Sequence, residues 1–212
     1  MIMFDPSTIE MLKTGILETL YMTFASSVIS YLLGIPLGLI LVVTDKNGIH
    51  PIVWMERVLG LIVNLLRSIP FIILLIMVLP LTRAIVGTTL GCNAVVVPLV
   101  IAATPYIARM VESSFKEVDA GVIEAAKSMG ATTMQIVWKV LLPEAKPSLL
   151  VGAAISVTTI LGYSAMAGFV GGGGLGTIAI NYGYYRYETD MMLVTVAILV
   201  IIVQIIQEAG MK

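Results

Sequence analysis

The chain has 212 residues, of which 58% are hydrophobic and only 12% are charged, and its mean hydropathy is +1.03. Soluble globular chains are about 45–50% apolar and about 25% charged, so this composition excludes an ordinary soluble domain and predicts an all-α protein that crosses a membrane several times. The net charge of -1 gives no support to nucleic-acid binding. One cysteine, Cys92, excludes an intrachain disulfide, and one histidine, His50, leaves no histidine cluster for zinc.

Five stretches are apolar and long enough to cross a bilayer, which takes about 20 residues as a helix. They cover residues 19–43, 58–80, 92–111, 147–170 and 190–207. Four prolines lie inside these stretches, and we expect them to kink the helices without interrupting them, because neighbouring helices can satisfy the freed backbone groups. These are Pro36, Pro70, Pro98 and Pro105. No internal repeat or linker divides the chain, so residues 1–212 are expected to form a single transmembrane domain.

An odd number of spans places the two termini on opposite faces of the membrane, and the loops richer in Lys and Arg are expected in the cytoplasm. One set of loops carries eight such residues: Lys46, Arg57, Arg109, Lys116, Lys127, Lys139, Lys146 and Lys212. The other set carries three: Lys13, Arg83 and Arg186. The sequence therefore predicts an external N-terminus, a cytoplasmic C-terminus and a cytoplasmic loop over residues 112–146.

This loop has the signals of a short, well-capped helix. Asp119 can cap the N-terminus of a helix over Ala120–Met129, and Gly130 can end it in the left-handed conformation. Glu124 and Lys127 are spaced as an i,i+3 ion pair on that helix. Its apolar surface with small residues suits docking into a groove on another protein, and the alternative is a helix that lies on the lipid surface.

A second helix is expected directly after the first. Thr132 and Gln135 have the spacing of a capping box, and we expect the helix that they start to end at Pro143.

These residues form a long gapped motif. Glu124-Ala125-Ala126, then Gly130, then Leu142-Pro143 stand at the spacing of the EAA loop that the chain resembles, that of bacterial ABC importer permeases. Val140 stands where that pattern has Ile. The stretches "NLLRSIPFIILL", "PYIARMVE", "GYSAMAG", "GGGGLG" and "NYGYYRY" resemble the permeases of methionine-uptake ABC importers and cover most of residues 64–187.

The resemblance implies a type I ABC importer permease fold in the bacterial inner membrane. It also implies a homodimer, two cytoplasmic ATPase subunits that hold ATP and Mg, and an extracytoplasmic substrate-binding protein or lipoprotein. The chain itself is then no enzyme and carries no cofactor or metal. Its expected cargo is L- and D-methionine. The expected ATPase-coupling residues are Gly121, Glu124, Ala125, Ala126, Met129, Gly130 and Ala131.

The fourth span carries the candidates for a polar path. Its hydroxyl groups can wet a pore or only assist close helix packing, and the expected path residues are Ser156, Thr159, Tyr163 and Ser164. Met166, near the outer end, is a candidate gate with simple packing as the alternative. Arg67 has two readings, a side chain that reaches the cytoplasmic interface or a functional group inside the membrane.

Other functions are weaker on this sequence. An importer for another amino acid is the nearest alternative. A secondary transporter driven by an ion gradient often needs acidic residues near the middle of its spans, and Glu18, Asp190 and Glu208 are expected at span ends. A membrane enzyme lacks a cluster of catalytic groups, and a purely structural protein leaves the capped loop unexplained.

Gly171–Gly176 fits the G-x-G-x-x-G fingerprint of dinucleotide-binding loops. That fingerprint needs a preceding strand, whereas here an apolar span precedes the loop. We therefore expect a tight external turn where the binding protein docks, with the nucleotide on the ATPase across the membrane.

Overall fold

The computed structural model describes residues 5–210, and every regular element in that range is helical. Lys212, counted above among the cytoplasmic charges, lies outside the described residues. Four helices are long and apolar enough to cross a membrane, and a bent pair of shorter helices is a fifth candidate. The chain is thus all-α, with four to five candidate spans.

The first helix, α1 (Pro6–Thr44), is 39 residues long and begins well before the expected residue 19. At 1.5 Å per residue it is about 58 Å long, which exceeds a bilayer with its headgroups. Glycines bring it close to α5 (Cys92–Lys116). A Cβ on Gly34 would lie 2.7 Å from the Ile107 side chain, and one on Gly38 would lie 2.6 Å from the Ala108 carbonyl oxygen. This small-xxx-small pair permits the close packing typical of membrane helices.

The expected second span is broken. Residues 58–80 fall on α2 (Val53–Ser68), α3 (Phe71–Met77) and the start of α4 (Leu79–Val86), and the axes of α2 and α3 differ by 102°. The expectation that Pro70 only kinks this span was wrong. The residue before a proline avoids the helical region, and Ile69 has extended dihedral angles of -81° and 123°. Pro36, Pro98 and Pro105, by contrast, lie inside continuous helices.

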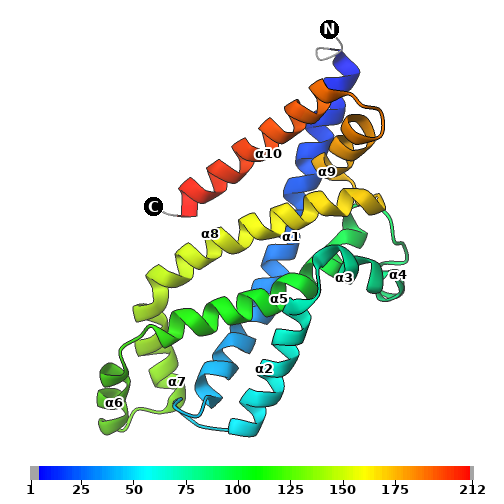
Figure 1. Cartoon of the computed structure of the whole chain (residues 1–212). Helices are drawn as coiled ribbons and strands as arrows, with labels where there is room; N and C mark the ends of the chain where they lie inside the picture. The colour runs from blue at the N-terminus through cyan, green and yellow to red at the C-terminus, as the bar shows by residue number, and fades with distance from the viewer. Residues whose placement is uncertain (1–4, 211–212) are drawn as a thin grey trace.

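The second half of the chain alternates long and short helices. The long ones are α8 (Leu142–Met166) and α10 (Thr189–Gly210). The short ones are α6 (Ala120–Ser128), α7 (Thr133–Ile136), the π-helix η1 (Val137–Leu141), the 3-10 helix η2 (Ala167–Val170), α9 (Gly174–Ile178) and the π-helix η3 (Ala179–Tyr184). Figure 1 shows α5 between α2 and α8, with α6 and α7 at one end of the bundle and α9 at the other.

The helix after the capping box was expected to end at Pro143, but it continues beyond that residue. Residues 133–170 form one continuous helical stretch. A proline lacks a backbone donor, and here it follows a π-helical turn in which the Leu142 N–H donates to the Val137 carbonyl, five residues back. Helix α7 is therefore joined to α8 without a flexible link.

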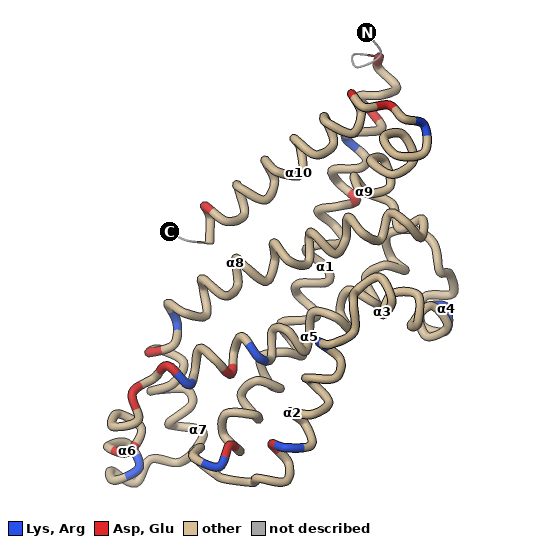
Figure 2. Tube along the Cα trace, in the orientation of Figure 1, with Lys and Arg blue, Asp and Glu red and all other residues tan. Residues whose placement is uncertain are grey.

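Charged residues gather at the two ends of the bundle, and the middle of the long helices is almost free of them (Figure 2). A buried cluster ties the α6 end together. It joins Ile107 and Phe115 of α5 with Ala126 of α6, Leu141 of η1 and Ile160 of α8. The short α6 thus packs on the same core as the long helices.

Candidate functional site

Helix α6 has the two caps that its sequence predicts. The Gly121 N–H donates to the Asp119 carboxylate at 2.7 Å, and a Cβ on Gly121 would lie 2.8 Å from that oxygen. Gly130 has a φ of +78° and its N–H donates to the Lys127 carbonyl, while the Ala131 N–H donates to the Ala126 carbonyl at 3.1 Å. This is the Schellman arrangement, in which a left-handed residue closes the helix.

Most of the expected coupling residues lie on the free surface of α6. Gly121, Glu124, Ala125, Met129 and Gly130 are exposed, and the Met129 side chain is 80% exposed. Two of the set face inward, since Ala126 is buried in the core and Ala131 is half-buried. The helix therefore presents glycine, alanine and methionine outward and is anchored by Ala126. An exposed methionine beside small residues is a surface that adapts to a partner groove.

A long-range polar contact links α6 to the turn that follows α1. The expected Glu124–Lys127 ion pair is not formed within the described part of the chain. Instead, the Lys127 ammonium donates to the Gly48 carbonyl at 3.3 Å. Because Gly48 is 79 residues away in the chain, helix spacing alone points to the wrong partner. The capping box at Thr132 and Gln135 is formed as expected.

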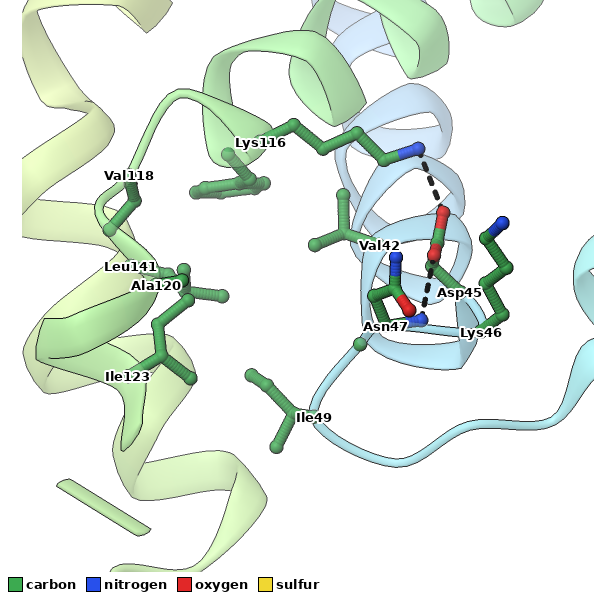
Figure 3. Close-up of a pocket in the computed structure, with 12 residues that line it drawn as sticks. Val42, Asp45, Lys46, Asn47, Ile49, Lys116, Val118, Ala120, Ile123 and Leu141 are labelled. Carbon is green, nitrogen blue, oxygen red and sulfur yellow. Dashed lines mark hydrogen bonds and ion pairs between the residues drawn. The ribbon is translucent and has the colours of Figure 1, made fainter. Parts of the chain in front are cut away.

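A chain of ion pairs continues from this turn into the bundle. The Lys116 ammonium lies 2.9 Å from the Asp45 carboxylate and 2.8 Å from the Glu112 carboxylate, and Glu112 also pairs with Arg109. The Asn47 backbone N–H and the Lys116 ammonium together hold the pKa of Asp45 below its ordinary value. Figure 3 shows Lys116 and Asp45 meeting at the edge of a hollow of about 410 Å³, with Ile49 and Ile123 on its walls.

The expected path residues on α8 are divided between the interior and the surface. Ser156 and Ser164 are buried, and each donates to a carbonyl of its own helix at 2.7 Å. They therefore do not line a surface of this chain. Tyr163 stacks on Phe71 with ring centroids 4.6 Å apart, and Met166 is 46% exposed at the end of α8. Thr159 is half-buried and donates to the Ile155 carbonyl.

A polar groove of about 730 Å³ runs over α5 between α2 and α8. Its polar lining comes from all three helices: Arg67, Tyr106, Arg109, Ser113, Ser114, Glu117 and Ser148. The sequence singled out only Arg67 among these. The others escaped notice because they are scattered over residues 106–148 and no short spacing connects them. The structure places them on one surface with Val151 and Ile155.

The glycine-rich turn has its own ligand inside the chain. Gly171, Gly173 and Gly174 all have positive φ. The Gly174 N–H donates to the Glu18 carboxylate at 2.6 Å, and the Leu175 N–H donates to the Thr19 hydroxyl at 2.9 Å. The Glu18 carboxylate therefore already accepts the hydrogen bond of a backbone N–H of the kind that would bind a phosphate in a dinucleotide loop. Glu18 lies within α1, the helix that begins at Pro6.

Residues 34–209 match the family described as the inner membrane component of binding-protein-dependent transport systems. The chain belongs to this family. It is 49% identical over 201 residues to a Vibrio cholerae protein named "Probable D-methionine transport system permease protein MetI", covering 95% of this chain and 89% of that one. It is 51% identical over 158 residues to the D-methionine transport system permease protein MetI of Escherichia coli, covering 74% and 73%.

Solved structures give the same result for the fold of this permease. A chain from a structure titled "Inward facing conformations of the MetNI methionine ABC transporter" matches with a TM-score of 0.95 and 48% identity, over 98% of this chain and 96% of that one. A chain from an amino acid ABC transporter matches with a TM-score of 0.79 at 21% identity, which shows the fold alone. The type I permease fold expected from the EAA loop is therefore confirmed.

Proposed function

We propose that this chain is the membrane-spanning subunit of an ATP-driven importer that brings L- and D-methionine into a bacterial cytoplasm. The observation that carries the proposal is the exposed, doubly capped α6, whose caps and core contacts make it a rigid docking element. The close likeness to D-methionine permeases supports the cargo. The chain is the non-catalytic permease, and a separate ATPase subunit supplies ATP hydrolysis with Mg²⁺.

The orientation follows from the same element. We place α6 and the C-terminus in the cytoplasm, where the ATPase lies, and the N-terminus and glycine-rich turn outside, where a substrate-binding protein or lipoprotein delivers methionine. The Lys and Arg excess near α6 supports this orientation. Two copies of the chain enclose the path in the inner membrane, with one ATPase subunit bound to each α6.

The mechanism is a transfer of rigid-body motion. When the ATPase subunits close on ATP, each α6 moves with its docking groove. The shared core and the unbroken run from α7 into α8 pass this motion to the wall of the path. This explains why the loop is stiff: a flexible link would absorb the displacement before it reached α8.

The path is assigned to one face of α8. Val151, Ile155, Gly162 and Met166 are exposed and recur at helical spacing, with Thr159 half-buried on the same face. Met166 lies at the external end of this face and is the proposed gate, to which a flexible thioether is suited. In the resting, reconstituted transporter, Met166→Ala is expected to let methionine leak without ATP, and an unchanged leak would assign Met166 to packing.

The overall proposal is tested by reconstituting the chain in liposomes with its ATPase and binding protein. The expected result is ATP-dependent uptake of L- and D-methionine. Uptake of a different amino acid would correct the cargo, and uptake driven by an ion gradient without ATP would contradict the ABC importer assignment.

The docking of α6 is tested with a matched pair of glycine variants. Gly130 and Gly87 both have positive φ, +78° and +83°, and a Cβ on either meets nothing within 4 Å. Gly130→Val and Gly87→Val therefore impose similar backbone strain, about 1–2 kcal/mol. Only Gly130→Val is expected to reduce association with the ATPase and uptake. Equal ATPase association and uptake in the two variants would refute docking at α6.

A further inference from the structure

The groove between α2 and α8 contains a cation without a partner. Arg67 is exposed, and within residues 5–210 its guanidinium makes no hydrogen bond or ion pair. The neighbouring Arg109 is different, since two of its guanidinium nitrogens are taken by Glu112 and by the Gly60 carbonyl at 3.0 Å, and the third, Nε, is buried. Arg67 is thus the group on this surface that is available to a negatively charged ligand.

The position of Arg67 along α2 argues against a role at the membrane interface. It lies near the C-terminal end of α2, fourteen residues beyond Val53. At 1.5 Å per residue this is about 21 Å along the helix, in a hydrocarbon layer about 30 Å thick. That distance exceeds what a side chain can span to reach the N-terminal end of α2. Charged groups at such depth face a water-filled cavity or a partner and not lipid.

The rest of the groove completes an amphipathic site. Ser113 is exposed on α5, Tyr106 is half-buried on the same helix, and both line the groove. Ser148 of α8 donates to Ser114 of α5 at 2.9 Å, which fixes the two walls relative to each other. Apolar surface is supplied by Met110, Val151 and Ile155. A few convergent polar groups beside apolar side chains are typical of small-molecule sites.

We propose that this groove is a transit site for the amino acid on its way to the cytoplasm, and that Arg67 binds its α-carboxylate. The inference rests on the proposed import function and adds the residue that holds the cargo inside the membrane. A guanidinium can grip a carboxylate through two parallel hydrogen bonds. Ser113 and Tyr106 offer hydroxyls to the polar end of the ligand, and Met110, Val151 and Ile155 contact its apolar side chain.

An open, wet groove suits this purpose. A transit site has to bind its cargo strongly enough to accept it and weakly enough to release it. Water competes for an exposed guanidinium, so the pair contributes less there than in a closed pocket. The site is therefore expected to bind methionine weakly and to affect transport more than retention.

The direct test measures, by saturation-transfer NMR, the binding of methionine to the purified permease–ATPase complex in the absence of nucleotide and binding protein. Arg67→Gln is expected to weaken binding about tenfold, as loss of a charged hydrogen-bond partner does. Arg57→Gln is the matched control, because Arg57 is an exposed arginine on the same helix outside the groove. Because both variants carry the same ATPase, the difference in binding between them excludes the contribution of any methionine site on the ATPase. Equal binding by Arg67→Gln and Arg57→Gln would overturn the proposal.

The ligand's carboxylate is tested with methioninol, which carries a hydroxymethyl group in its place. Wild-type protein is expected to bind methioninol about tenfold more weakly than methionine, and Arg67→Gln is expected to bind the two alike. Equal binding by the wild type would contradict a carboxylate site. Arg67→Lys keeps the charge but not the fork, so an intermediate loss is expected, and this variant decides the question if Arg67→Gln assembles poorly.

An anionic lipid headgroup could bind Arg67 through the same chemistry as the methionine carboxylate. The two ligands are distinguished by the lipid composition of the bilayer. The effect of Arg67→Gln on methionine binding is expected to be the same in nanodiscs of zwitterionic lipid and of anionic lipid. An effect confined to anionic lipid would assign the groove to a headgroup and overturn the inference. In liposomes, methionine imported per ATP is expected to fall in Arg67→Gln alone. A wild type that imports no methionine would refute the proposed function instead.

Discussion

At one end of the bundle α6 is attached to the long helices through side chains, whereas at the other end the glycine-rich turn is held through its backbone. The Lys127 contact and the Lys116–Asp45 ion pair leave the outer face of α6 free. At the opposite end, the amides of Gly174 and Leu175 are bound by α1, and the glycines touch their neighbours directly. The first arrangement can move as a body against a partner, while the second admits almost no substitution.

The largest effect is expected where the glycine end is tightest. A Cβ on Gly176 would lie 2.2 Å from the Ala165 carbonyl oxygen, so Gly176→Ala forces α9 away from α8 and is expected to cost about 3 kcal/mol or more. Gly162→Ala is the matched control, because a Cβ there meets nothing within 4 Å. Thermal unfolding of the purified protein measures both. Equal stability of the two variants would show that the glycine end is not tightly packed.

The second effect concerns the carboxylate that binds the turn. Glu18→Ala leaves the Gly174 N–H without its acceptor and is expected to lower the free energy of unfolding by about 2 kcal/mol. Glu10→Ala is the control, since Glu10 lines one hollow together with Glu18 and Gly174, is exposed and makes no contact of this kind in the described chain. If both variants unfold at the same temperature, the amide contact contributes nothing to stability.

The third effect belongs to the α6 end and is expected in coupling more than in stability. Lys116→Met keeps the apolar stem and removes the charge that joins Asp45 to Glu112. Because these pairs are partly exposed, a stability loss of only about 1 kcal/mol is expected. Methionine imported per ATP is expected to fall several-fold, whereas Lys46→Met, next to Asp45, has no effect. If methionine uptake and ATP hydrolysis fall in the same proportion, Lys116 has a purely structural role.

The same comparison explains which features could be predicted from the sequence. The caps of α6 and the capping box of α7 depend on residues two to five apart, so short spacings predicted them correctly. The Glu18–Gly174 contact joins residues 156 apart, and the Lys127–Gly48 contact joins residues 79 apart. No local pattern encodes such pairs, because they depend on how whole helices pack.

The two wrong predictions about prolines, Pro70 and Pro143, have the same origin. Pro70 breaks a span and Pro143 does not break the helical stretch in which it lies. The difference is whether the preceding turn can be rearranged, as the π-helical turn before Pro143 is. The polar groove was missed because it is assembled from three helices. Arg67 and Arg109 both lie inside expected apolar spans, and only Arg67 was singled out from the sequence.

The smallest effect is the pH dependence of the ion pair that joins Asp45 to Lys116. The pKa of Asp45 is lowered in the folded protein, first by the Asn47 backbone N–H and then by Lys116. A group with a depressed folded pKa contributes its stability in full above the unfolded value, here 3.8, and loses it as the pH falls through the folded value. The stability difference between wild type and Asp45→Asn is therefore expected to stay constant above about pH 5 and to shrink progressively below it, as the pH falls through 3.8 and then through the lower folded value. Thermal unfolding of both proteins across this range measures the difference, and a decline already at neutral pH would assign the effect to another group.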